Sequence, residues 1–193
     1  RGFSLEKCEF LYKLLGKPLF FLLPAEWVHE QVMFWGETMG SSSLVRKLVS
    51  YFFIYENSML STKIGRVSFS NPVGLSAGYD YTAAFPRILP AVGFGFETIG
   101  TISDQPFEGN PKPRLGRLPK SQSLLVNKGF KNPGASEIIE KISGEKFAFP
   151  VGISIGRTNN GETNTIEKAV SDIVSAFKKF EKSKVRNAYY ELN

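Results

Sequence analysis

Cysteine and histidine are almost absent from this sequence. Cys8 is the only cysteine and His29 the only histidine in 193 residues. A single thiol excludes a disulfide framework and a cluster of thiolate metal ligands, and one imidazole excludes an ordinary histidine-based zinc or iron centre built by this chain alone. We therefore expect no metal ion and a reducing, intracellular setting, so any catalysis needs another base or a cofactor.

Long hydrophobic runs are absent as well. The most apolar stretch, from Phe10 to Val28, is interrupted by two lysines and two prolines, whereas a membrane-spanning helix needs about 20 predominantly apolar residues. The sequence therefore predicts no transmembrane helix. Because it opens on Arg1, we expect the native start, with any targeting segment, to lie upstream.

The overall composition is that of a folded protein with a net positive charge. Hydrophobic residues make up 42% of the chain and charged residues 22%, with a formal net charge of +6, which suits either a nucleic-acid binder or a protein on an anionic membrane surface. The basic residues are scattered in pairs such as Arg46-Lys47 and Lys178-Lys179, without a dense block. We therefore favour a solvated surface and expect no nucleic-acid partner.

The amino-terminal third predicts three short helices. The first has Ser4 as its cap and reaches Leu15 or Leu23, and the second begins at Pro24 and ends at Gly40. The third carries one apolar stripe at three- and four-residue spacing, formed by Leu44, Val45, Leu48, Val49, Phe52 and Phe53.

These helices hold more large apolar and aromatic side chains than a small helical hairpin can bury within itself. Two interpretations remain open. The surplus can pack against the domain that follows, or it can form an interfacial helical pair whose apolar face enters the lipid headgroup region with Lys13 and Lys17 at its edge.

After residue 62 the pattern changes to strands separated by stretches that could be helical. Ile64, Val67 and Phe69 predict a short β element that ends at the turn signal Asn71-Pro72. Four short apolar runs follow, at 73–77, 96–101, 151–155 and 188–192, with candidate helices at 80–92, 135–142 and 165–182 between them. We therefore divide the chain into a helical part, 1–62, and a β/α part, 63–193.

Alternating strands and helices predict a parallel sheet with right-handed crossovers. An eightfold β/α barrel has about 250 residues, and the second part holds four strands, with Asn193 at the mouth of the fourth. The predicted fold class is α/β, the first half of a (β/α)8 TIM barrel preceded by a small helical amino-terminal domain. An open half barrel would leave unpaired edges, so we expect the other half as further sequence or as a second polypeptide.

Small and polar residues occupy all four predicted strand ends, where barrels place their working residues. They are residues 77–81, Gly100-Thr101, residues 154–157 and Asn193. Glycine lets a flat ring or a phosphate approach the backbone, while hydroxyl and amide groups supply directed hydrogen bonds. At any one site glycine is simply common at strand ends, but its recurrence at successive ends favours a cofactor pocket.

An excursion after the second strand adds a predicted hairpin over this mouth. Residues 114–118 and 124–127 can pair as two strands, and excursions at this face usually build sites. Alternatively, Arg114 and Arg117 are exposed charges on a lid.

Several motifs together resemble one family, the class 2 (quinone-dependent) dihydroorotate dehydrogenases. They are NPVGLSAGYD at 71–80, Gly100-Thr101, GNPKPRLGRLPK at 109–120 and NKGF at 127–130, with PAEWVH at 24–29 and YYELN at 189–193. The resemblance covers nearly the whole chain. It implies that residues 1–62 are a helical extension that associates with the membrane and lines a quinone tunnel.

The resemblance also implies site residues. FMN would contact Ala77, Gly78, Tyr81, Thr101, Ser154 and Asn193. The substrate, dihydroorotate, would meet Asn127, Lys128, Gly129 and Phe130, and the quinone path would pass His29 and Arg117. The implied location is peripheral, on the cytoplasmic face of a bacterial inner membrane or on the mitochondrial inner membrane.

The implied reaction is the oxidation of dihydroorotate to orotate in de novo pyrimidine biosynthesis, with electrons passed through FMN to a membrane quinone. In this class the base is a serine in the loop after the fourth strand, which would lie just beyond Asn193. No residue of this chain is therefore named as the base, and we expect the chain alone to be inactive.

The sequence departs from the family pattern at three places. Tyr81 stands where the family has a lysine that bridges flavin and substrate, and Ser154 stands where many members have asparagine. NKGF is one residue shorter than the family's N-R-x-G-F, so either Asn127 or Val126 could take the substrate-amide position. Our hypothesis is that Lys128 supplies the charge missing at 81, since a phenol cannot place a positive charge there.

Two rival functions remain. Another FMN barrel, such as a dihydrouridine synthase acting on RNA, would explain the charge and the pocket but not the aromatic helices before the barrel. A flavin- or membrane-binding module without turnover is suggested by Tyr81 and by the missing base.

Overall fold

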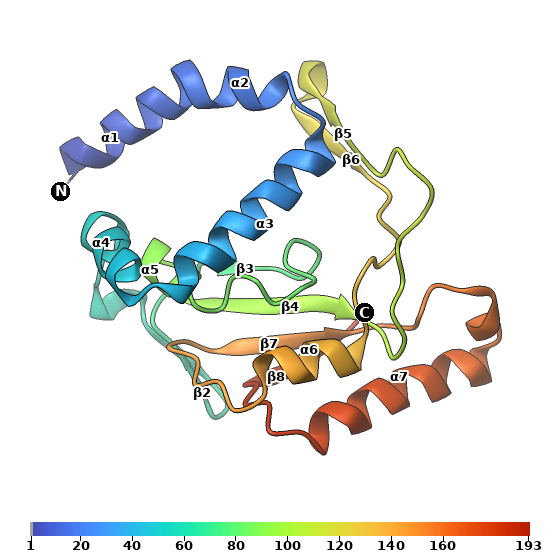
Figure 1. Cartoon of the computed structure of the whole chain (residues 1–193). Coiled ribbons are helices and arrows are strands. Elements are labelled where there is room, and N and C mark those ends of the chain that lie inside the picture. Colours follow the sequence, from blue (N-terminus) through green and yellow to red (C-terminus); the bar gives the residue numbers. More distant parts are fainter. Residues whose placement is uncertain (1) are drawn as a thin grey trace.

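The computed structural model describes residues 2–193, and its first part is helical (Figure 1). Helix α1 (Gly2–Leu11), a π-helical turn (Tyr12–Gly16) and α2 (Lys17–Phe21) follow one another without a break, above α3 (Ala25–Ser41) and α4 (Ser43–Phe53) in the figure. The expected cap at Ser4 is wrong, because the helix already includes Gly2. A capping preference alone does not set a helix start where the preceding residues can extend the first turn.

The boundaries of α3 also differ slightly from the expectation. Pro24 is the residue before the first helical turn, with ψ of 134°, and Ser41 rather than Gly40 is the last helical residue. Gly40 instead lets helix α3 pack closely against Arg87, because an added Cβ would lie 3.2 Å from the Cβ of Arg87. Ser42 separates the two helices and caps α4, its Oγ accepting a hydrogen bond from the N–H of Val45.

Four parallel strands form the sheet of the second part, in the order in which they occur in the chain. They are β3 (Gly74–Leu75), β4 (Phe96–Ile102), β7 (Val151–Ile155) and β8 (Tyr189–Leu192). A short antiparallel hairpin, β1 (Thr62–Ile64) and β2 (Val67–Phe69), comes first in the chain. A second hairpin, β5 (Leu115–Leu118) and β6 (Ser123–Val126), lies in the predicted excursion.

The helices α6 (Ala135–Ile142) and α7 (Ile166–Glu181) cover one face of this sheet (Figure 1). Between sheet and helices lies the main core, in which these side chains are buried: Ile99, Ile102, Ile138, Val151, Ile153 and Phe180. A second cluster packs Met33 of α3 against Phe85 and Ile88. The alternation of strand and covering helix confirms the expected α/β half barrel with amino-terminal helices.

The segment 80–92 is helical only at its end, which corrects the expected helix there. Only α5 (Leu89–Val92) forms. The carboxylate of Asp80 accepts hydrogen bonds from the N–H groups of Thr82, Ala84 and Phe85, and such local bonds compete with helix formation. Ala83 has a positive φ of 54°, so the chain turns away from a helical path.

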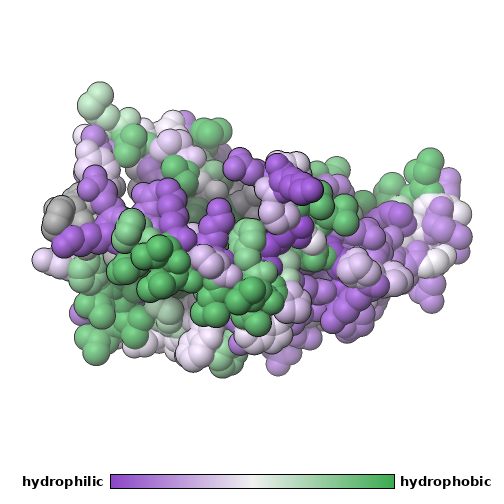
Figure 2. Space-filling view, turned by 90° about the horizontal axis from the view of Figure 1, so that it is seen from above, coloured by the Kyte–Doolittle hydropathy of each residue, from purple (hydrophilic) through white to green (hydrophobic). Residues whose placement is uncertain are grey.

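Apolar side chains gather on the amino-terminal half of the surface. In Figure 2 they concentrate on the side where Figure 1 places the amino-terminal helices, whereas the opposite end is mostly hydrophilic. On α4 alone, Leu44, Leu48 and Phe52 are exposed.

Among residues 2–193, no helix combines the length and the hydropathy that crossing a bilayer requires. Because α3 contacts β5 and α4 contacts α5, the two parts pack on each other, and the division at residue 62 stays a prediction.

Candidate functional site

A polar cavity of about 390 Å³ lies at the carboxyl ends of the sheet strands. Its walls include Gly78, Tyr81 and Thr101 from the strand ends, and Asn127, Lys128, Gly129 and Phe130 from the segment after β6. Residues predicted for flavin and residues predicted for substrate therefore border one cavity. Val126 borders it too, so the choice between Val126 and Asn127 at the substrate-amide position stays open.

Three polar side chains from neighbouring strands meet beside this cavity. The Oγ1 of Thr101 lies 3.2 Å from the Oγ of Ser154, and the Nδ2 of Asn193 donates to the same Oγ1 at 2.7 Å. Parallel pairing of β4 with β7 and of β7 with β8 brings the three residues together. The result is a row of hydroxyl and amide groups, in which Thr101 borders the cavity and Ser154 is fully buried.

Glycines shape the adjoining backbone. Gly78 has φ of +102°, and an added Cβ there would meet no atom within 4 Å, so open space lies in front of it. Gly100 has φ of +132°, and its added Cβ would lie 2.7 Å from the carbonyl oxygen of Ser154. The N–H of Gly78 donates to the carbonyl of Gly100 at 2.7 Å, which fixes the segment after β3 against the end of β4. Ala77 precedes this contact and is partly exposed.

The segment 127–130 is held by three asparagines. Asn110 donates from Nδ2 to the Oδ1 of Asn127 at 2.8 Å, and Asn159 donates to the carbonyl of Gly129 at 3.2 Å. Asn132 donates to the carbonyl of Phe130 at 2.8 Å. Both Gly129 and Phe130 have positive φ angles, 69° and 63°, and these bonds hold that turn in place.

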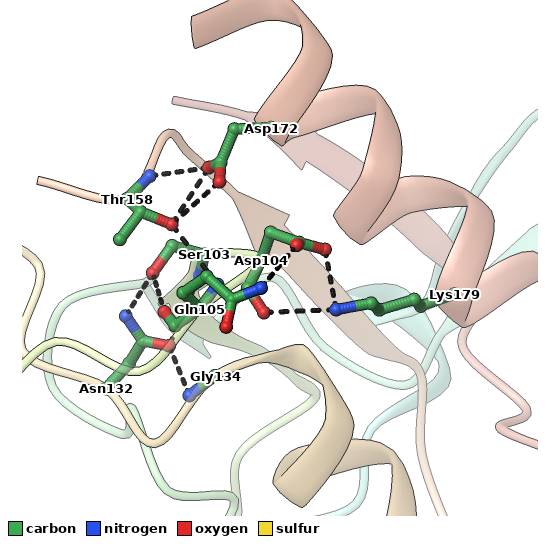
Figure 3. A network of polar contacts seen from close by, with 8 residues as sticks. All are labelled: Ser103, Asp104, Gln105, Asn132, Gly134, Thr158, Asp172 and Lys179. Carbon is green, nitrogen blue, oxygen red and sulfur yellow. Dashed lines mark hydrogen bonds and ion pairs between the residues drawn. The ribbon is translucent and has the colours of Figure 1, made fainter. Parts of the chain in front are cut away.

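A buried polar network supports the loops around the cavity (Figure 3). The Oδ1 of Asn132 accepts from the N–H groups of Ser103 and Gly134, at 3.2 and 2.8 Å. Thr158 bonds to Asp172 of α7 through its N–H and its hydroxyl, and its Oγ1 accepts from the N–H of Gln105. The network thus ties the segments after β4, β6 and β7 to one helix.

Helix α3 contributes a buried histidine close to the cavity. The Nε2 of His29 donates to the carbonyl of Tyr79 at 2.9 Å, which leaves Nδ1 to accept from the Nζ of Lys128 at 3.1 Å. The ring of His29 also stacks on that of Tyr81, with centroids 5.7 Å apart. Burial, followed by the charge of Lys128, lowers the pKa of His29, so the imidazole is neutral and fits these two hydrogen bonds.

Arg114 and Arg117 both contact the amino-terminal helices, so neither is a free charge on a lid. Arg114 is buried and its Nη2 lies 2.8 Å from the Oε1 of Glu26. Arg117 donates from Nη1 to the carbonyl of Leu23 at 2.7 Å, and its guanidinium lies 4.9 Å from the ring centroid of Phe21.

A second, apolar cavity of about 780 Å³ lies between the amino-terminal helices and the segment 75–94. Its lining includes Phe20, Trp27, Val32, Trp35, Tyr79 and Phe85. Tyr79 lines the apolar cavity, and its carbonyl accepts the hydrogen bond from the Nε2 of His29. The protein therefore has a polar and an apolar cavity, and His29 bonds to a lining residue of each, Lys128 of the first and Tyr79 of the second.

The family model described as dihydroorotate dehydrogenase matches residues 59–193. The chain belongs to this family. A protein named "Dihydroorotate dehydrogenase (quinone)" from Trichormus variabilis is 34% identical over 179 residues, covering 87% of this chain and 47% of the relative. One of the same name from Acinetobacter baumannii is 36% identical over 165 residues, covering 86% and 46%. The chain thus spans about half the length of these curated relatives.

Solved structures agree with this assignment. The DHODH of Eimeria tenella in complex with ferulenol has a TM-score of 0.69 and 28% identity, over 88% of this chain and 43% of that one. The expected resemblance to quinone-dependent dihydroorotate dehydrogenases is therefore confirmed at the level of the family. Dihydroorotate dehydrogenases depend in general on a flavin.

Arg157 and Asn159 also border the polar cavity, together with Lys131. From the sequence, Arg157 was included among the strand-end residues 154–157 without a role of its own, and Asn159 and Lys131 were not named. A position in a loop after a barrel strand was the available signal for Arg157 and Asn159. Lys131 carried no such signal, because it reaches the cavity only through the left-handed turn at 129–130.

A buried pair of carboxyl groups behind the strand tips was missed as well. Glu97 and Asp80 are both fully buried. Burial, with the charge and hydrogen bonding of Asp80, raises the pKa of Glu97 to about 10. Neither carboxyl oxygen of Glu97 has a hydrogen-bond partner within the part of the chain that the structure describes, so burial favours the protonated, uncharged form of this side chain.

Proposed function

We propose that this chain is the FMN- and substrate-binding part, with the quinone-facing helices, of a quinone-dependent dihydroorotate dehydrogenase. The reaction is the oxidation of dihydroorotate to orotate in pyrimidine biosynthesis, with electrons leaving through a membrane quinone. The observation that carries the proposal is the pair of cavities, one polar at the strand ends and one apolar under the amino-terminal helices, with His29 bonded to Lys128 of the first and to Tyr79 of the second. The quinone-dependent names of the relatives support the same activity.

The polar cavity fits a flavin ring. The open space at Gly78 admits a flat group close to the backbone. Thr101 borders the cavity, and its hydroxyl contacts the side chains of Ser154 and Asn193, which we assign to the same ring site. We assign Ala77 and Tyr81 to the wall of this ring site. Bound FMN supplies the hydride-accepting and electron-relaying chemistry, while the protein side chains orient the ring and exclude water. In barrels of this type the phosphate commonly lies at strands 7 and 8, so this half would hold the ring.

Asn127, Lys128, Gly129 and Phe130 form the substrate wall of the proposed site. The bond from Asn110 occupies the oxygen of the Asn127 amide, which leaves the NH2 group of Asn127 to donate to a substrate carbonyl. Phe130 borders the cavity with 38% of its surface exposed, and it provides an apolar contact for a planar ring. We assign the proton-abstracting base to no residue of this chain.

The apolar cavity is the proposed quinone site. Its lining is almost wholly hydrophobic and aromatic, which suits an isoprenoid quinone. His29 and Arg117 donate to the carbonyls of Tyr79 and Leu23, two residues that line this cavity. The exposed apolar groups of α2, α3 and α4, including Leu22, Phe34, Trp35 and Leu48, would rest in the interfacial region of a membrane. We place the protein on the negatively charged cytoplasmic face of a bacterial inner membrane, or on the mitochondrial inner membrane, in keeping with its positive charge.

The other half of the barrel is the proposed partner of α7 and β8. An exposed apolar stripe runs along α7 through Ile166, Val170, Val174 and Phe177. Strand β8 pairs only with β7 among the described strands, so its outer edge is free to add a strand. Further β/α units, in the same or another polypeptide, would cover both, as the greater length of the relatives suggests.

One experiment separates the proposed activity from its alternatives. The complete protein is loaded with FMN, and dihydroorotate is added without oxygen while flavin absorbance is followed, before a soluble quinone analogue is introduced. Bleaching by dihydroorotate and recovery with the quinone support the proposal. Activity that depends on RNA would indicate a dihydrouridine synthase, and bound flavin that neither compound changes would indicate a module without turnover.

A further inference from the structure

Lys128 is a buried cation that faces the polar cavity without an ion-pair partner. Its side chain is 9% exposed and borders the cavity. Among residues 2–193, no carboxylate lies within ion-pair distance of its Nζ, whereas the neighbouring Lys131 pairs with Glu30 and Arg114 pairs with Glu26. Buried charges are normally paired, so an unpaired ammonium at a cavity wall indicates a site for an anion.

Two aromatic side chains hold the ammonium in place. The Nζ of Lys128 lies 4.6 Å from the ring centroid of Tyr81 and 3.1 Å from the Nδ1 of His29. The face of a phenol ring attracts a cation, and the neutral imidazole accepts one of the three ammonium N–H donors. The other two donors remain for a ligand, so the lysine is both oriented and available.

We propose that Lys128 binds the carboxylate of dihydroorotate and orotate, with Tyr81 and His29 positioning its ammonium group. This inference rests on the proposed function and adds to it the residue that recognises the anionic end of the substrate. Tyr81 itself cannot carry that charge, because burial and the nearby carboxylates raise its pKa to about 12 and its neutral hydroxyl is the only polar group that it offers. Lys128 thereby supplies the positive charge that the family resemblance implies for position 81, where this chain has tyrosine.

The charges around Lys128 make the binding depend on pH. Burial lowers its pKa to about 8; Glu26 and Glu30 of α3 oppose this shift, whereas Lys131 and Arg114 add to it. His29 and Tyr81, the remaining titratable groups in contact with it, are neutral near that pH. The protonated lysine binds the anion, so affinity for orotate is constant well below pH 8 and falls by up to about tenfold per pH unit above it.

The test measures orotate binding to the complete, FMN-loaded protein by the change in flavin absorbance between pH 6 and 9.5. Lys128→Met should weaken orotate binding at pH 7 by about 10- to 100-fold, the range for hydrogen bonds to charged groups. The affinity of this variant for orotate should also no longer fall above pH 8. Lys128→Arg should keep its affinity to higher pH than the wild type. Lys120→Met removes the same charge from the exposed turn between β5 and β6 and should leave binding unchanged.

A rescue variant and FMN affinity separate binding from folding. Tyr81→Lys combined with Lys128→Met should recover orotate affinity, while Lys128→Met, Lys128→Arg and Lys120→Met should keep an FMN affinity within about threefold of the wild type. If Lys128→Met bound FMN and orotate like the wild type, the assignment of Lys128 would be wrong and the proposed function would stand. If the wild type itself bound FMN but not orotate, both would be wrong.

Discussion

Arg114 and Glu26 form a buried ion pair between the excursion over the strand ends and helix α3, with Nη2 and Oε1 2.8 Å apart. The guanidinium also donates to the carbonyl of Glu108, so one side chain fastens the start of the β5–β6 hairpin to two segments. The position of this hairpin relative to the amino-terminal helices therefore depends on a contact that is protected from water.

Removing either charge of this pair should strongly destabilise the protein. Arg114→Met leaves the Glu26 carboxylate buried without its partner, and breaking such a pair costs about 3–5 kcal/mol. The free energy of unfolding, from urea titration of the complete protein, measures the loss. The double variant Arg114→Met, Glu26→Leu should recover part of it, because no charge is then left unpaired; equal stability of single variant and wild type would contradict the expectation.

Glu97 should make the protein less stable as pH rises. Its pKa is raised from an ordinary value of 4.5 to about 10 in the fold, so the folded state binds the proton more tightly than the unfolded state. Its contribution is fully present below about pH 4.5 and is lost as pH increases towards 10. Glu97→Gln, which keeps the shape and an N–H donor, should therefore be more stable than the wild type at pH 8 by at least about 1 kcal/mol.

Unfolding free energies at pH 5.5 and 8 measure this difference. Glu140→Gln, on the exposed side of α6, is the matched control and should show the pH dependence of the wild type. A Glu97→Gln protein whose stability still followed the wild-type pH profile would show that Glu97 is not the group responsible.

The sheet and its strand ends could be predicted because their signals are local. Short apolar runs at 96–101 and 151–155 predicted β4 and β7 closely, and the barrel rule then placed Thr101 and Ser154 at one end. The row that these residues form with Asn193 follows from parallel pairing alone. Here one rule of topology, added to the sequence pattern, was enough to bring distant residues together.

The missed features depend on contacts between distant segments or on backbone detail. The segment after Asp80 has the composition of a helix, but the Asp80 carboxylate takes the N–H groups that would begin one. The contact of Lys128 with His29 joins residues 99 positions apart in the sequence, and no periodicity encodes it. The hypothesis that Lys128 supplies the charge missing at 81 arose from the resemblance to the family, whereas the contact of its ammonium with the Tyr81 ring required the structure.

Asn132 should control the shape of the substrate wall. Its amide bonds to Phe130, Ser103 and Gly134, so Asn132→Ala leaves buried donors and an acceptor unsatisfied, at about 1–3 kcal/mol for each group lost. We expect a lower unfolding free energy and about tenfold weaker orotate binding, because the turn at 129–130 loosens. Asn164→Ala, at an exposed position, should change neither quantity. Unchanged orotate affinity in a destabilised Asn132→Ala protein would limit the role of Asn132 to folding.

Filling the apolar cavity should block the quinone without affecting the substrate. Val32 lies on α3 and lines that cavity, so Val32→Trp places an indole in the space proposed for the quinone. Flavin bleaching by dihydroorotate should keep its wild-type rate, while reoxidation by the quinone analogue should slow by about tenfold or more, as expected when overpacking or occlusion removes a binding volume. Thr38→Trp introduces the same group at an exposed position of the same helix and should leave both half-reactions unchanged. If Val32→Trp slowed bleaching as much as reoxidation, the two cavities would not serve separate half-reactions.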